Sequence, residues 1–165
     1  MYDQLTQDDI RKMEEEIEHR KVVVRKELLE SVKEARAHGD LSENFEYKAA
    51  KREKNQNESR IRYLEKMIKT AKVITDRSGD DEVGLNKMVD LYFEDDDETE
   101  TMKVVTTVRE NSLNGRISNV SPLGKAILGH KVGDRVYVKV NDRMGYYVVI
   151  KGIRSDDTEE ELRSY

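Results

Sequence analysis

Two acidic residues three positions apart, Asp40 and Glu43, stand in the short segment AHGDLSEN that separates two long stretches of helical pattern. Carboxylate oxygens are the ligands that Mg²⁺ prefers in proteins, so this pair could help to hold such a cation. Mg²⁺ takes about six oxygen ligands, and two carboxylates cannot complete the set. Metal chemistry at this pair therefore requires further ligands from a partner.

The same spacing also has a purely structural explanation. In a capping box, Asp40 would accept a hydrogen bond from the backbone amide three residues later, and Glu43 would reach back to the amide of Asp40. The helix dipole also favours acidic side chains at a helix start. The sequence alone leaves the metal-ligand interpretation and the capping interpretation both open.

Basic side chains are concentrated just after the acidic pair. Residues 48–72 contain nine Lys and Arg against three Glu, whereas residues 3–18 contain seven acids and two bases. Two antiparallel arms would neutralise much of this charge against each other. The cations nearest the turn have fewer partners, and we expect them to be available to nucleic-acid phosphate. These residues are Arg36, Lys48, Lys51 and Arg52.

The composition excludes several classes of protein and site. The chain has no Cys and three scattered His, which excludes disulfides, thiol nucleophiles and Cys-based zinc or iron–sulfur sites. No run approaches the roughly 20 apolar residues that a membrane span needs, and the N-terminus is acidic where a signal peptide is basic. We therefore expect a cytoplasmic protein with no membrane partner.

Two helical arms are needed to position the acidic pair. In the second arm, seam residues recur at alternating intervals of three and four from Tyr47 to Ala71, the pattern of a helix that packs along a partner. The first arm shows the same spacing from Ile10 to Ala35, with a lapse around Arg20–Lys21. Gly39 offers the only easy reversal point between them. Residues 1–75 are therefore predicted to form a long antiparallel coiled-coil hairpin with an acidic tip.

The second half of the chain differs in kind. It carries 13 Lys and Arg against 19 Asp and Glu, and its Val- and Tyr-rich runs are separated by turn signals. Strands are predicted over 88–93, 102–108, 135–140 and 146–153. Ser121 and Pro122 stand at the N-cap and first position of a predicted short helix that ends before Gly129. The fold class is thus α+β, the hairpin being followed by a small antiparallel sheet with one short helix.

The predicted boundaries follow from these patterns. Residues 76–82 are rich in turn-forming side chains and are predicted to be a linker. Residues 83–154 would form the sheet domain. The acidic residues 155–165 are predicted to be a disordered tail.

Two segments resemble the signatures of one known family. The stretch EARAHGDLSENFEYKAAKREKNQNESRIRYLEKMIKTAKVI, residues 34–74, resembles the hairpin of the bacterial transcript cleavage factors GreA and GreB. The stretch ISNVSPLGKAILGHKVGDRVYV, residues 117–138, resembles their C-terminal signature. The resemblance covers residues 5–153 and is closer to GreA in the tip and in the Ser-Pro helix. It implies that the sheet domain is FKBP-like.

The resemblance also implies a function and roles for individual residues. Such factors insert the hairpin into the secondary channel of RNA polymerase and stimulate cleavage of backtracked nascent RNA near its 3′ end. Asp40 and Glu43 would help to hold a Mg²⁺ ion shared with the polymerase active site, and the free protein would bind none. The other residues that match are Gly39, Leu41, Ser42 and Asn44 for tip shape, Arg36, Lys51 and Arg52 for RNA contact, and Ser121 and Pro122 for docking on the channel rim.

Two other functions remain compatible with the residues. A related protein could occupy the channel and inhibit the polymerase, although inhibitors of this kind typically have an altered tip. A structural coiled-coil adaptor would tolerate changes at the tip acids. An independent nuclease is disfavoured because only two acids converge and no base accompanies them. We expect the free protein to be a monomer and not to be an enzyme by itself.

Overall fold

The computed structural model describes residues 3–39 and 44–164, which divide into two compact units. The hairpin unit contains Gln7–Lys72, and the sheet unit contains Val73–Tyr165 together with Gln4–Thr6 from the start of the chain. The change of unit falls between Lys72 and Val73. The sequence did not indicate that Gln4–Thr6 belong to the sheet unit.

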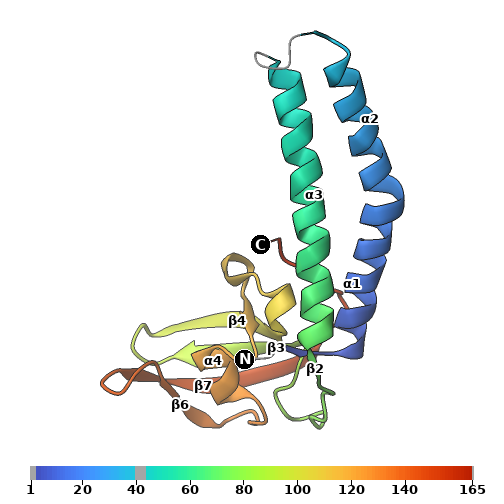
Figure 1. Ribbon diagram of the computed structural model, residues 1–165. Coiled ribbons are helices and arrows are strands. Elements are labelled where there is room, and N and C mark those ends of the chain that lie inside the picture. The colour runs from blue at the N-terminus through green and yellow to red at the C-terminus, as the bar shows by residue number, and fades with distance from the viewer. Residues whose placement is uncertain (1–2, 40–43, 165) are drawn as a thin grey trace. The chain divides into compact units, whose positions relative to one another are not determined.

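Two arms lie side by side in the hairpin unit (Figure 1). The first arm consists of α1 (Gln7–His19), η1 (Arg20–Val24) and α2 (Arg25–Arg36), and the second is α3 (Phe45–Thr70). The 26 residues of α3 span about 39 Å at 1.5 Å per residue. The predicted seam is confirmed, since none of its residues in either arm is exposed.

The predicted lapse at Arg20–Lys21 is a π-helical turn, η1. Asn57, a polar residue within the seam of the second arm, is buried opposite this turn. Its side-chain amide donates to the backbone carbonyl of Arg20 at 3.3 Å, and its Oδ1 accepts from the Arg20 guanidinium at 2.9 Å. The extra residue of a π-turn shifts the phase of the helix, and Asn57 satisfies polar groups at that shift. A polar seam residue of this kind specifies the register of the two arms.

Charged pairs join the two arms beside this turn. Glu16 accepts from Arg60 at 2.8 Å and from Arg20 at 2.8 Å, and Arg25 binds Glu58 through two hydrogen bonds of 2.7 and 2.8 Å. Burial raises the pKa of Glu16, but its hydrogen bonds with Arg60 and Arg20 outweigh this effect, so the pKa is lowered overall. Part of the basic excess of α3 is therefore neutralised by the first arm, as the charge pattern indicated.

The sheet unit contains a five-stranded sheet in the order β5-β4-β3-β7-β6. Neighbouring strands are antiparallel except β4 and β5, which are parallel. The strands and the helix that lies beside them are β3 (Lys87–Phe93), β4 (Glu98–Val105), β5 (Arg116–Ser118), α4 (Pro122–Ile127), β6 (Arg135–Lys139) and β7 (Gly145–Ser155). The predicted antiparallel pairing is confirmed for β3, β4, β6 and β7. The strand β5 was not predicted; it pairs parallel with β4 and is reached through two short 3₁₀ helices, η2 (Thr107–Arg109) and η3 (Ser112–Asn114).

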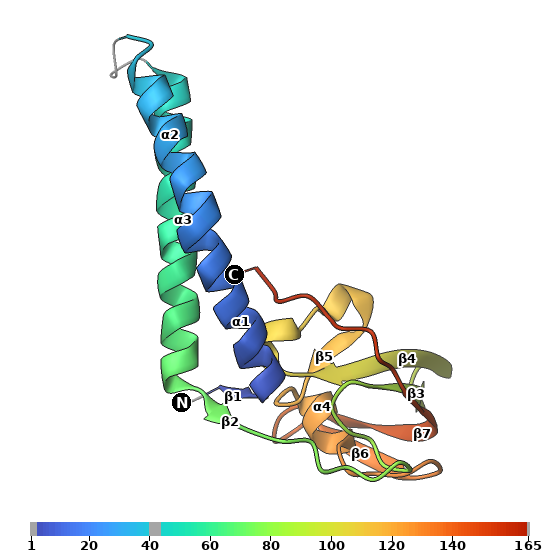
Figure 2. The same ribbon diagram turned by 90° about the vertical axis from the view of Figure 1, so that its right-hand side faces the viewer.

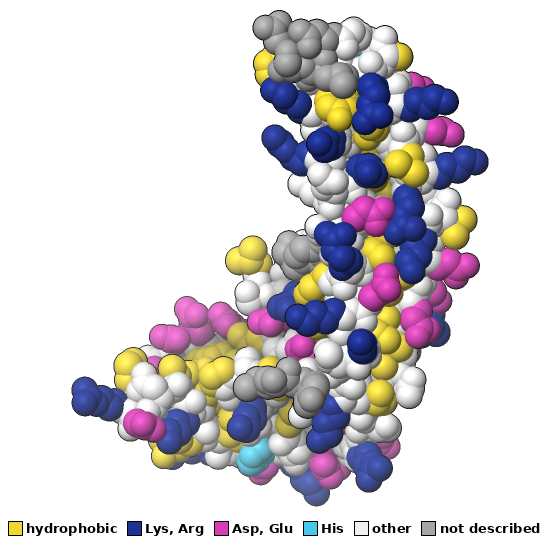
Figure 3. Space-filling view, in the orientation of Figure 1, with side chains coloured by type: hydrophobic (Ala, Val, Ile, Leu, Met, Phe, Trp, Pro, Cys, Tyr) yellow, Lys and Arg dark blue, Asp and Glu magenta, His cyan; other side chains and the backbone are white. Residues whose placement is uncertain are grey.

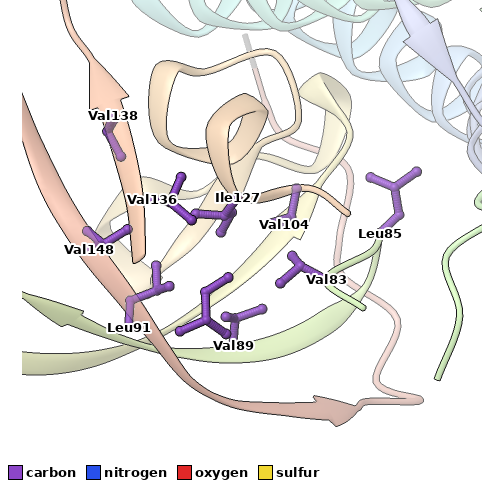
Figure 4. Close-up of a cluster of buried hydrophobic side chains, with 10 residues drawn as sticks. Val83, Leu85, Val89, Leu91, Val104, Ile127, Val136, Val138 and Val148 are labelled. Carbon is purple, nitrogen blue, oxygen red and sulfur yellow. The ribbon is translucent and has the colours of Figure 1, made fainter. Parts of the chain in front are cut away.

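Apolar side chains from the sheet and from α4 form the core of this unit (Figure 4). Val89 and Leu91 of β3, Val104 of β4 and Ile127 of α4 have no exposed surface. Alternate residues of a strand face opposite sides of the sheet, so this set defines the inner face. The core cluster contains no described residue beyond Ile153.

Two very short strands complete the structure, β1 (Gln4–Leu5) and β2 (Lys72–Val73). The amide of Lys72 donates to the carbonyl of Asp3 at 2.9 Å, and the amide of Ile74 donates to the carbonyl of Leu5 at 2.8 Å. In the part of the chain that the structure describes, no helix is long and apolar enough to cross a membrane.

The C-terminal residues differ from the predicted disorder. Residues 156–164 form no helix or strand, but their backbone and acidic side chains bind Lys103 and Arg109 in the sheet unit. The acidic composition alone could not indicate this packing, because the partners lie about 50 residues earlier in the chain.

Candidate functional site

The hairpin tip lies between Arg36, where α2 ends, and Phe45, where α3 begins. Four of the predicted site residues lie outside the described residues: Asp40, Leu41, Ser42 and Glu43. Gly39 and Asn44 are the described residues that flank this segment. Gly39 has a φ of +122°, which favours glycine, consistent with its predicted place in the reversal.

Asn44 holds the start of the second arm. Its Oδ1 accepts from the Tyr47 amide at 2.9 Å, which makes it the N-cap of α3, and its amide nitrogen donates to the Ala35 carbonyl at 2.6 Å. One side chain thus caps α3 and ties it to the end of α2. The N-cap of α3 is therefore Asn44, whereas the predicted capping box of Asp40 and Glu43 lies outside the described residues.

Arg36 and Tyr47 pair across the base of the tip. The Arg36 guanidinium donates to the Tyr47 hydroxyl at 3.5 Å and lies 5.5 Å from the centre of its ring. This hydrogen bond, with the nearby charge of Lys51, lowers the pKa of Tyr47. The lowered pKa indicates a positive electrostatic potential at the Tyr47 hydroxyl. The sequence placed Tyr47 in the seam and gave no indication that it orients Arg36.

Further contacts surround the same base. His38 lies 3.0 Å from the carboxylate of Glu46, across the turn from it. Phe45 is 81% exposed, with the Lys48 ammonium 5.8 Å from the centre of its ring. Phe45 was not among the predicted site residues, because an apolar residue at a helix start is usually interpreted as one that packs against a neighbouring element.

Lys51 and Arg52 are exposed on the first turns of α3 and form no hydrogen bond or ion pair with residues 3–39 or 44–164. Lys and Arg side chains are numerous over the upper part of the hairpin in the space-filling view (Figure 3). The tip therefore carries cations that the facing arm does not neutralise. These residues are Arg36, Lys48, Lys51 and Arg52. This arrangement suits phosphate binding.

No group of three or more His, Cys, Asp or Glu that could hold a metal occurs in the described ranges. Asp40 and Glu43 lie outside these ranges; their hard oxygen donors match Mg²⁺ in kind but not in number. The donor set fits an ion that a second protein also binds.

The predicted docking residues belong to the sheet unit. Ser121 caps α4, as predicted: its hydroxyl accepts from the Gly124 amide at 3.1 Å and donates to the Ser118 carbonyl at 2.6 Å. Pro122 is the first residue of α4 and is exposed, and Val120 is 53% exposed. Because the Ser121 hydroxyl is used internally, we assign it to positioning. Val120 and Pro122 are the exposed residues on either side of it, and we call these two residues the predicted docking corner.

Comparisons with known proteins match most of the chain. Residues 3–73 match the family described as "Transcription elongation factor, N-terminal", and residues 78–155 match "Transcription elongation factor, GreA/GreB, C-term". The transcription elongation factor GreA of Bacillus velezensis is 44% identical over 82% of this chain and 86% of its own length. That of Thermoanaerobacter pseudethanolicus is 45% identical over 82% and 87%. A crystal structure of GreA factor homolog 1 (Gfh1) of Thermus thermophilus aligns at 27% identity over 94% of this chain and 100% of that one, with a TM-score of 0.43.

Proposed function

Because this chain belongs to the GreA/GreB family of transcription elongation factors, we propose that it stimulates cleavage of backtracked RNA by RNA polymerase. In this proposal the hairpin enters the secondary channel, where the extruded RNA 3′ end lies, and the sheet unit docks on the channel rim. The polymerase supplies the active site, and this chain supplies ligands. The reaction would take place in the cytoplasm, with one copy of the chain per polymerase.

The cap of α3 is the observation that carries the proposal. Asn44 performs the task that the capping interpretation assigned to Asp40, so the start of α3 does not explain the acidic pair. A rigid base formed by Asn44, Arg36 and Tyr47 holds both ends of the segment that contains the acids. This observation supports the assignment of the two carboxylates to metal binding.

Asp40 and Glu43 would hold Mg²⁺ jointly with ligands of the polymerase. The bound ion supplies a Lewis acid and a water of lowered pKa for phosphodiester hydrolysis. The contribution of this chain is to bring two carboxylates to the ion at the end of a stiff arm. Arg36, Lys51 and Arg52 would bind the phosphates of the extruded RNA and keep the strand in place.

The proposal is tested with a stalled, backtracked elongation complex that carries RNA labelled at its 5′ end. We expect the purified protein and Mg²⁺ to shorten the RNA from its 3′ end and to restore extension when nucleotides are added. Slower extension without shortening would mean that the chain is a channel-occupying inhibitor. Binding with neither effect would mean that it is an adaptor.

The role of the basic residues predicts a salt-dependent defect. Lys51→Glu is expected to slow cleavage about tenfold at low ionic strength, because a phosphate contact worth about 1.4 kcal/mol is lost. The defect should shrink as salt is added, since screening weakens both the wild-type attraction and the new repulsion. The measurement is the cleavage rate across a series of salt concentrations.

Lys69→Glu is the matched control, because Lys69 is an exposed lysine at the other end of α3. Equal rates for Lys51→Glu and Lys69→Glu at every salt concentration would contradict a guiding role at the tip. The excess charge of α3 would then serve only the pairing of the arms.

A further inference from the structure

The acidic residues that follow β7 lie against three cations of the sheet unit. We call residues 156–163 the C-terminal strap; after β7 it runs as an extended trace without helix or strand (Figure 2). We call its partners the strap site: Lys103 on β4, Arg109 on η2 and Arg116 on β5. The strap lies beyond the residues that the family models match.

Lys103 is the centre of the strap site. Its ammonium has three donors and uses all of them on the strap: the Thr158 carbonyl at 2.7 Å, Glu160 Oε1 at 3.0 Å and Asp156 Oδ2 at 3.2 Å. The side chain has no exposed surface. A lysine is buried this completely only when its charge is paired and hydrogen-bonded.

The two arginines bind the same part of the strap. Arg116 Nε donates to Glu160 Oε1 at 2.8 Å, and Arg109 Nη1 donates to the Glu160 backbone carbonyl at 2.6 Å. Burial raises the pKa of Glu160, but its hydrogen bonds with Lys103 and Arg116 produce a net lowering. One glutamate therefore connects β4, η2 and β5.

The strap lies against β4, η2 and β5 and is not part of the core. Val104 faces the core, and since neighbouring residues of a strand face opposite sides, Lys103 faces away from it. No strap residue belongs to the core cluster. If the strap leaves, Lys103 meets water and the core keeps its packing. Contacts that are polar and lie outside the core can be made and broken while the sheet stays folded.

We propose that Lys103, Arg109 and Arg116 form a binding site for an acidic peptide segment, and that the chain's own strap is its resident, exchangeable ligand. The site recognises two carboxylates four residues apart, those of Asp156 and Glu160, and the backbone carbonyl of Thr158 between them. This inference goes beyond the proposed function and does not depend on it.

The test measures binding of a labelled peptide of residues 155–165 to the full chain. Wild-type protein should bind it weakly, because the tethered strap competes at a local concentration on the order of millimolar. The double variant Asp156→Asn with Glu160→Gln, whose own strap is neutralised, should bind the peptide at least about tenfold more tightly. Adding Lys103→Met to that variant should abolish the gain, whereas Lys151→Met, an exposed lysine on β7, should leave it.

Equal peptide binding by wild type and by the neutralised variant would overturn the proposal. A wild-type dimer that dissociates with Lys103→Met would also overturn it, since the occupant would then be the strap of a second copy. Hydrogen exchange on the full chain gives an independent measure. The Arg163 amide donates to the Val108 carbonyl at 2.7 Å, and its protection should be lost in Lys103→Met. Unchanged protection would mean that the strap does not depend on the site.

Discussion

Cleavage stimulation is expected to fall roughly a hundredfold or more when Asp40 and Glu43 are both replaced by alanine. Loss of residues that only support a metal ligand costs about 10- to 100-fold, and loss of the ligands themselves costs at least as much. Binding to the polymerase should persist, because the arms and the sheet unit are untouched. The measurements are the rate of RNA shortening and competition with the wild-type chain for polymerase.

Two controls separate metal binding from a change of charge at the tip. Glu46→Ala removes one acid next to the tip, where the carboxylate contacts His38, and should keep most of the activity. In the single variants, higher Mg²⁺ concentration should restore part of the rate if the lost group is a ligand. Wild-type cleavage by the Asp40→Ala, Glu43→Ala double variant would refute the assignment of both residues.

The second large effect is expected at Gly124, on the helix that carries the docking corner. Gly124 is buried where α4 packs on the end of β5, and a β-carbon there would collide with the carbonyl oxygen of Ser118. The Ser118 carbonyl belongs to the backbone and also accepts from the Ser121 hydroxyl, so it cannot move away from a new β-carbon without a large energetic cost. Overpacking of this kind costs about 3 kcal/mol or more, which exceeds the gain of up to about 1 kcal/mol from alanine in a helix.

We therefore expect Gly124→Ala to lower the melting temperature of the sheet unit by roughly 10 °C or more. Methyl NMR signals of Ile127 and Ile150, which are core residues of this unit, report its unfolding separately from that of the hairpin. Lys125→Ala, an exposed position in the same helix, should change the melting temperature little. Unchanged stability of Gly124→Ala would mean that α4 can move away from β5 without cost. In the variant that unfolds, polymerase affinity should fall with the loss of the docking corner.

The sequence was most informative where a pattern repeats over many residues. Intervals of three and four along both arms predicted the hairpin, and the lapse at Arg20 located the π-helical turn before its form was known. The Ser121–Pro122 start of α4 was predicted because capping is a local interaction between residues three apart. Such signals depend on neighbours in the chain, so they can be read without the tertiary structure.

The features that were missed depend on distant partners or on very short segments. β1, with two residues, and β5, with three, are too short to show alternation. The first four residues of β4 precede the predicted strand, because exposed acidic side chains there interrupt the apolar pattern. Asn44 was recognised as a tip residue, but its double role needed the position of Ala35 to be known. The burial of Lys103 follows from a strap more than 50 residues later.

The short strand β1 has a consequence for how the chain reaches its native state during synthesis. Leu5 is fully buried and its carbonyl accepts from the Ile74 amide, so the sheet unit includes residues that are synthesised before the hairpin and residues that are synthesised after it. The hairpin between them makes mainly contacts that close early in translation, and once folded it brings its two ends together. Pairing of Leu5 with Ile74 closes the chain between them, and the folded hairpin lowers the entropic cost of that closure because it has already ordered most of this segment. The arm that carries the acids is thus also the element that lets the other unit complete its fold.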